Sequence, residues 1–146
     1  MVSIYNYNAI KKGFVSRIIC LALIILLFAA IFILSIYYPS IKWVSMVIAA
    51  LGCILSGVFG VLLLAKASAQ YRFVNQVKHG ITTSATLTVT GFGQTVTTGF
   101  WTLNSVIMTD GSQSITLLVE GEPFKEGQSV TVVTHNNRIV QYQING

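Results

Sequence analysis

Residues 18–38 read IICLALIILLFAAIFILSIYY and contain no charged side chain. In an α-helix these 21 residues rise about 1.5 Å each, enough to cross the roughly 30 Å hydrocarbon core of a bilayer. The stretch therefore predicts a transmembrane helix. A secretory signal peptide is the alternative, but its apolar region is usually only about 7–15 residues long and a small-x-small cleavage motif follows it. No such motif follows Tyr38.

A second apolar run covers residues 43–64, and no proline interrupts the chain between this run and Gly80, a typical helix C-cap residue. Apolar side chains continue to recur at helical spacing after the run ends. We therefore expect one helix from about Val44 to His79. Its first part would cross the membrane, and residues 65–80 would form a cytoplasmic stalk.

Basic residues flank the two spans unequally. The first 80 residues carry a formal charge of +7 without any acid, and the remaining 66 carry −2. Only Lys42 lies between the spans; the other six lie outside them: Lys11, Lys12, Arg17, Lys66, Arg72 and Lys78. The positive-inside rule then predicts a multi-pass protein of the inner (cytoplasmic) membrane, with the N-terminal segment 1–17 and the C-terminus both cytoplasmic. The pI near 9.4 reflects these flanks, so membrane lipid is an expected partner and DNA is not.

Small residues recur every four positions along the second span, in two adjacent rows. One row holds Ser45, Ala49, Cys53 and Gly57, and the other holds Gly52, Ser56 and Gly60. Such a face lets helix backbones approach closely in lipid. It predicts either an oligomerisation seam between copies of the chain or packing against the first span of the same chain, and the sequence does not choose between them.

Beyond Gly80 the pattern alternates and threonine becomes the commonest residue, which is typical of strands. We expect six short strands in a domain of residues 81–146, near Thr83–Thr90, Thr95–Leu103, Ser105–Thr109, Ser114–Glu120, Ser129–His135 and Arg138–Ile144. Turn residues separate them, at 91–93, 110–111, 121–123, 126–127 and 136–137. The chain as a whole predicts an α+β membrane protein, in which a two-helix transmembrane hairpin precedes a small antiparallel β barrel or sandwich of the OB or SH3-like kind.

Alternation within these strands also predicts which side chains face the core. The inward set is Leu87, Val89, Val96, Phe100, Val106, Met108, Ile115, Leu117, Val119, Val130, Val132, Val140, Tyr142 and Ile144.

The sequence contains no hydrolase, phosphate-loop, zinc-peptidase, dithiol or dinucleotide-binding motif. We therefore expect no enzyme, no catalytic residue, no metal and no cofactor. Both cysteines lie in the apolar runs, where a thiol behaves as a small hydrophobe.

A ligand-binding surface has better support. The hairpin His135-Asn136-Asn137-Arg138 concentrates hydrogen-bonding groups and holds one of the two cations of the β half, and Lys125 is the other. Arg and Lys hold phosphates, Asn reads base edges, and the Trp101 ring is a stacking platform for a base. The predicted ligand site is thus Lys125, His135, Asn136, a solvent-facing Arg138 and Trp101. The alternative is structural: turn chemistry at Asn136, a solvated strand end at Arg138, and a core or subunit-interface role for Trp101.

Two N-terminal spans, a stalk and a small cytoplasmic β domain with this hairpin resemble the CRISPR-associated two-helix membrane effectors. The resemblance covers the whole chain as architecture. It implies a homo-oligomer, in this family a tetramer, whose soluble domain binds a cyclic oligoadenylate. Such a nucleotide second messenger would lead the protein to alter the inner membrane in antiviral defence.

Residues 127–133, GQSVTVV, followed by 136–140, are also similar to the end of the OB domain in NfeD-like membrane proteins. That resemblance implies a non-enzymatic accessory partner of a stomatin-type scaffold. A small constitutive subunit of some other membrane protein complex fits the composition equally well and assigns no role to the hairpin.

Overall fold

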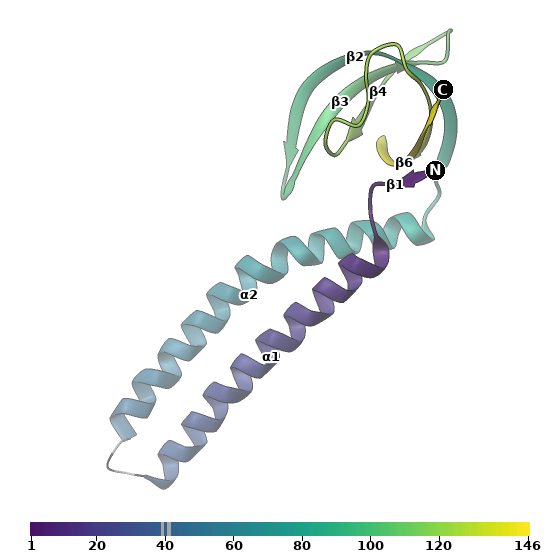
Figure 1. The fold of residues 1–146 in the computed structure, drawn as a ribbon. Coiled ribbons are helices and arrows are strands. Elements are labelled where there is room, and N and C mark those ends of the chain that lie inside the picture. Colours follow the sequence, from purple (N-terminus) through teal and green to yellow (C-terminus); the bar gives the residue numbers. More distant parts are fainter. Residues whose placement is uncertain (39, 41) are drawn as a thin grey trace. The chain divides into compact units, whose positions relative to one another are not determined.

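The structure, a computed structural model, describes residues 1–38, 40 and 42–146. The chain is α+β, with two long apolar helices followed by the main part of a six-stranded sheet (Figure 1). It divides into two compact units. One consists of Asn8–Tyr71, and the other, which we call the β unit, of Met1–Tyr7 together with Arg72–Gly146.

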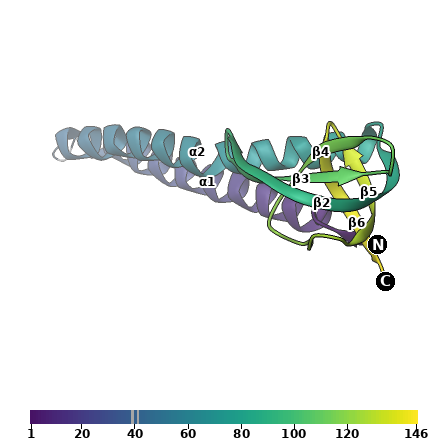
Figure 2. The ribbon, with the colours of Figure 1, turned by 90° about the horizontal axis from the view of Figure 1, so that it is seen from above.

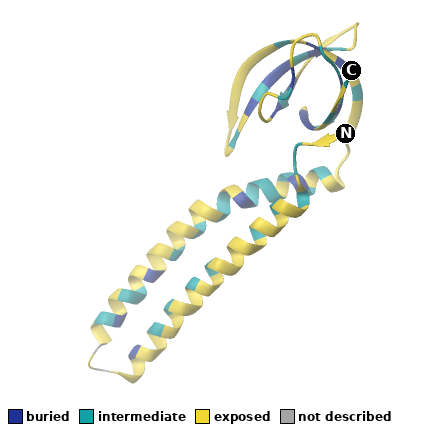
Figure 3. Ribbon diagram, in the orientation of Figure 1, coloured by how far each residue is buried: buried dark blue, intermediate teal, exposed yellow. Residues whose placement is uncertain are grey.

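The two helices are α1 (Tyr7–Tyr37) and α2 (Lys42–His79). The expectation of one uninterrupted helix ending at His79 is confirmed. Both helices are long and apolar enough to cross a membrane, and only 6% of the most apolar window of each is buried, so their surfaces are largely exposed (Figure 3). They lie alongside each other in both ribbon views (Figures 1 and 2). The expected membrane limits at residues 18, 38, 43 and 64 remain predictions.

The small-residue face of α2 divides into two parts. A Cβ placed on Gly52 would lie 2.2 Å from the Phe28 ring of α1, and one on Gly60 would meet Leu21 of α1 at 3.5 Å. Cys53 is exposed, and a Cβ on Gly57 would meet no atom within 4 Å. The row with Gly52 and Gly60 therefore packs α2 against α1 of the same chain, and an oligomeric role remains a prediction for the exposed part.

The sheet contains β1 (Val2–Ser3), β2 (Thr83–Thr98), β3 (Trp101–Thr109), β4 (Ser114–Val119), β5 (Ser129–His135) and β6 (Arg138–Asn145). The order is β1-β6-β4-β3-β2-β5, and β5 also pairs with β6. The pairs are antiparallel except β4 with β6, which are parallel and meet at Leu118 and Arg138. The last three predicted strands agree with β4, β5 and β6 to within one residue at each end.

The predicted turn at residues 91–93 is wrong, and so is the predicted strand Thr95–Leu103. Strand β2 continues through this segment, and its register against β3 shifts on either side of Phe92. The glycines therefore serve irregular pairing inside a long strand. The chain reverses instead at Gly99, whose φ of +59° suits a two-residue hairpin between the paired Thr98 and Trp101.

The core of the β unit is formed by β2 to β6. Most predicted inward residues are buried, and Val89, Val106, Met108, Val119, Val130 and Val132 are almost completely so. Four predicted members are exposed: Val96, Phe100, Ile115 and Ile144. The first two lie near the Gly99 hairpin, and the others lie at positions near strand ends. Among residues 81–146, three buried apolar residues were not predicted: Leu103, Phe124 and Ile139.

The N-terminal residues contribute to the β unit in a way that the sequence did not predict. Val2 and Ser3 pair with Tyr142 and Gln141 of β6, and the N–H of Ile4 donates to the carbonyl of Val140 at 3.0 Å. The Ile4 side chain packs against the core. Residues that precede the first apolar helix are thus part of the same unit as the C-terminal strand.

Candidate functional site

The β5–β6 hairpin holds Arg138 and turns through two asparagines. Asn136 and Asn137 have φ values of +49° and +60°, a left-handed conformation that asparagine tolerates better than most residues. The predicted turn is therefore confirmed. It brings His135 opposite Arg138 in the β5–β6 register, so the two side chains start from one end of the hairpin.

Arg138 lies in a cluster of three aromatic side chains. Its guanidinium carbon is 3.9 Å from the ring centroid of Trp101, 4.1 Å from that of Phe73 and 4.9 Å from that of Tyr5. The rings also meet edge to face, with centroids 5.3–5.9 Å apart. Each ring face attracts the cation through its quadrupole. We call Arg138, Tyr5, Phe73, Trp101 and Glu120 the Arg138 cluster.

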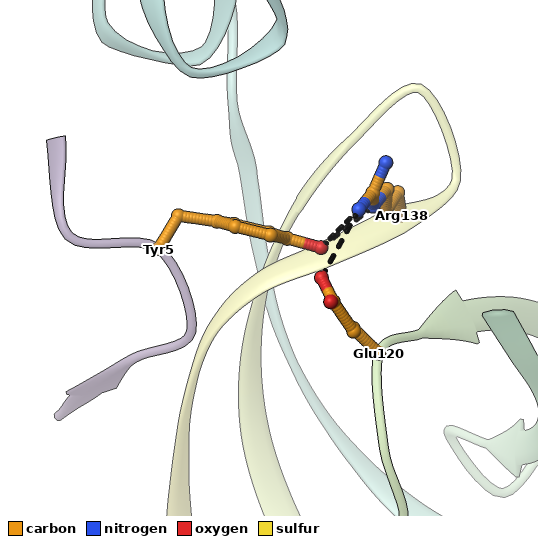
Figure 4. A network of polar contacts seen from close by, with 3 residues as sticks. All are labelled: Tyr5, Glu120 and Arg138. Atoms are coloured by element: carbon orange, nitrogen blue, oxygen red, sulfur yellow. Dashed lines mark hydrogen bonds and ion pairs between the residues drawn. The ribbon is translucent and has the colours of Figure 1, made fainter. Parts of the chain in front are cut away.

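The N–H groups of the Arg138 guanidinium also make polar contacts. Nε donates to the Tyr5 hydroxyl at 2.8 Å, Nη2 donates to the same oxygen, and Nη2 lies 3.5 Å from Oε2 of Glu120. Figure 4 shows both partners directed at Arg138. Burial raises the pKa of the Tyr5 phenol to about 12, although the Arg138 charge and hydrogen bonds act in the opposite direction. Tyr5 therefore remains a neutral phenol at physiological pH.

The expectation that Arg138 faces solvent is wrong, because the residue is only 6% exposed. A buried guanidinium needs partners for its charge and for its donors. Phe73 from the end of α2, Trp101 from the start of β3 and Tyr5 from the N-terminal segment supply them. Whether the same residue also binds a ligand remains a prediction.

The other predicted ligand residues are not all brought together. The His135 ring contacts Phe73 at 6.3 Å between centroids, and its Nδ1 lies 3.0 Å from the carbonyl of Ile81. Asn136 is exposed and its amide nitrogen lies 3.4 Å from His135 Nε2. Lys125 is exposed in the β4–β5 loop and takes no part in the Arg138 cluster within the described chain. The structure thus joins Trp101, His135 and Arg138 through Phe73, with Asn136 at the edge.

Sequence reasoning missed Tyr5, Phe73 and Glu120. One signal was available, because alternation counted back from the inward Val140 places Arg138 on the same side of its strand. Nothing in the linear sequence indicated that residues 5 and 73 would meet there.

The described residues include no group of three or more His, Cys, Asp or Glu side chains suited to a metal ion. Comparisons with protein-family models, curated proteins and solved structures find no match to this chain.

Proposed function

We propose that this chain is a self-associating, non-enzymatic membrane protein, anchored by α1 and α2 with both termini in the cytoplasm. Support for the anchor is the exposed apolar surface of two helices that meet the length requirement for a membrane span. Support for the orientation is the excess of basic residues outside the spans. We further propose that the β unit closes as a small barrel, because β5 pairs with both β2 and β6.

The observation that carries self-association is the outer half of β2. Residues 83–88 pair with β5, whereas the pairings of residues 91–98 within the described chain are all with β3. One backbone edge of residues 91–98 is therefore open. Natural edge strands are usually protected by charges, proline or coverage by other elements.

This outer half of β2 carries none of the usual charges. Residues 90–103 read TGFGQTVTTGFWTL and contain no ionisable group of either sign. Phe92, Val96 and Phe100 are 48%, 38% and 53% exposed. A second copy of the same neutral strand would meet it without charge repulsion, and antiparallel pairing about a two-fold axis satisfies both edges at once. We therefore assign a second copy of this chain as the occupant of the edge.

The test replaces Val96 by Lys, which places a charge on the proposed interface. The matched control is Ile144→Lys, because Ile144 is a similarly exposed apolar strand residue on β6. We expect Val96→Lys to lower the oligomer mass in neutral detergent and Ile144→Lys to preserve it. A monomeric native protein, or equal behaviour of the two variants, would refute self-association through β2. A reporter fused after Gly146 that is active only in the periplasm would refute the orientation.

A second candidate function is the sensing of a cyclic oligoadenylate, with a change in the inner membrane as the response. The observation that favours it is the proximity of Trp101, His135 and Arg138 through Phe73. A phosphate bound there would have to compete with Tyr5 and Glu120 for the N–H donors of Arg138. Calorimetric titration of the full chain with cyclic oligoadenylates tests it. Binding that His135→Ala and Asn136→Ala both weaken would support the site, whereas no binding at high micromolar ligand would favour the accessory-subunit function.

A further inference from the structure

A cavity of about 260 Å³ lies between α1 and α2, within the helical unit. Ile10, Phe14 and Ala67 form apolar parts of its wall, and Arg17 and Gln70 contribute polar groups. The helix positions 10, 13, 14 and 17 share one face of α1, so they look toward the same neighbour. The cavity is thus apolar on several sides and cationic at one point.

Three local features define this cavity. Gly13 forms part of the wall, and a Cβ at this position would meet no atom within 4 Å. Arg17 extends to α2, where its Nη1 donates to the backbone carbonyl of Leu63 at 3.3 Å. Phe14 stacks on Tyr71 with ring centroids 5.1 Å apart. The helices are therefore in contact at defined points while a gap remains beside Gly13.

Arg17 has no carboxylate partner along either helix, since residues 1–80 contain no Asp or Glu. Lys11, Lys12 and Lys66 are exposed within a few residues of the cavity wall in sequence. Arg17 also directly precedes the uncharged run that begins at Ile18, the depth at which a spanning helix meets lipid headgroups. Basic pockets between membrane helices at this depth suit anionic headgroups.

We propose that this cavity binds one anionic glycerophospholipid, whose phosphate is held by Arg17 and the Gln70 amide. The glycerol backbone and the first carbons of one acyl chain lie against Ile10, Phe14 and Ala67. This assignment rests on the membrane location given under Proposed function. A lipid fits better than a soluble phosphate compound because most of the cavity wall is hydrocarbon, which an acyl chain would cover and a small polar anion would not.

Native mass spectrometry of the full chain in neutral detergent tests the site with phosphatidylglycerol, phosphatidylcholine and glycerol 3-phosphate as separate probes. Gly13→Leu adds a side chain at the cavity wall, where a Cβ meets no atom within 4 Å, and replaces glycine by a better helix former. Arg17→Gln removes the cation. Lys12→Gln removes an equal charge outside the cavity wall and is the matched control.

We expect phosphatidylglycerol to bind tightly and phosphatidylcholine to bind more weakly. Gly13→Leu and Arg17→Gln should each weaken phosphatidylglycerol binding by about fivefold or more, whereas Lys12→Gln should change it less than about twofold. Equal effects of Arg17→Gln and Lys12→Gln would reduce the site to general surface charge and overturn it. So would an unchanged affinity of Gly13→Leu. Binding of glycerol 3-phosphate as tight as that of phosphatidylglycerol would assign the cavity to a soluble phosphate compound instead.

Alkaline carbonate extraction of membranes separates the failure of this inference from that of the membrane anchor. Native protein and all three variants should stay in the membrane pellet. If they do and lipid binding is absent, only the lipid site is wrong. Release of the native protein into the supernatant would refute the anchor itself.

Discussion

Replacement of Arg138 by alanine tests the Arg138 cluster most directly. The change removes a guanidinium that touches three aromatic rings and donates to the Tyr5 hydroxyl. It leaves Glu120 without its ion partner, but that side chain is 46% exposed and stays hydrated. Arg138→Ala therefore removes mainly side-chain packing and the interactions of a buried cation.

The magnitude follows from these contacts. A cation over an aromatic face contributes about 0.5–1 kcal/mol when exposed and about 2 kcal/mol when desolvated. A hydrogen bond from a charged donor contributes about 1.5–3 kcal/mol. The three rings share one guanidinium, so their contributions do not add fully. We expect Arg138→Ala to lower the free energy of unfolding of the β unit by about 3 kcal/mol, a large part of the roughly 5–15 kcal/mol typical of a domain.

Urea unfolding of the full chain in neutral detergent measures this loss through Trp101 fluorescence, in a Trp43→Phe background so that Trp101 is the only reporter. With a slope of about 1.5 kcal/mol per M, a loss of about 3 kcal/mol lowers the midpoint by about 2 M. Arg138→Lys keeps the charge but loses the planar stacking, so its urea midpoint should lie between those of the native protein and Arg138→Ala. Lys125→Ala, which truncates the exposed cation of the same unit, should change stability by less than about 0.5 kcal/mol. If Arg138→Ala and Lys125→Ala have equal midpoints, the cluster does not stabilise the β unit.

Three further predictions concern other parts of the fold. The pKa of Tyr5 rises from 10.0 to about 12 mainly because the phenol is buried. The contribution of the neutral phenol to folding stability is therefore fully present below pH 10 and is lost as the pH rises through about 12. The stability difference between native protein and Tyr5→Phe should shrink over that range, and a constant difference would contradict the assignment. The Asp110 carboxylate accepts from the N–H groups of Gln113 and Ser112, which lowers its pKa from 3.8 to about 2, so its stabilisation is present above pH 3.8 and is lost as the pH falls toward 2. Asp110→Asn should remove this part of the acid dependence of the urea midpoint, and an unchanged acid profile would show that the turn contributes nothing. Gly52→Leu should destabilise the α1–α2 pair by about 1–3 kcal/mol because its side chain meets Phe28. Gly57→Leu should not, because a Cβ at Gly57 meets no atom within 4 Å. Equal thermal stability of the two variants would show that Gly52 does not lie in the contact between α1 and α2.

The sequence predicted the elements that depend on local pattern. Apolar length and the C-cap Gly80 gave the end of α2, and the Asn-Asn turn gave the junction of β5 and β6. It failed at residues 91–98, where glycines that look like turn signals lie inside a bent strand. Glycine permits both a reversal and a bulge, and only the pairing partners of β2 decide between them.

The candidate site was predictable only in part, for a related reason. Trp101 and Arg138 were both selected, but as exposed recognition groups, because a charged residue beside a turn is usually solvated. Burial of Arg138 requires partners that no local pattern specifies, and two of them lie 133 and 65 residues earlier in the chain, at Tyr5 and Phe73. Tyr5 is positioned because β1 pairs with β6, and Phe73 because α2 continues beyond its apolar run into the β unit. The same cluster therefore ties the residues before the first helix and the last turns of the second to one strand end. A ligand that binds the Arg138 guanidinium would have to displace the Tyr5 hydroxyl and the Glu120 carboxylate from its donors.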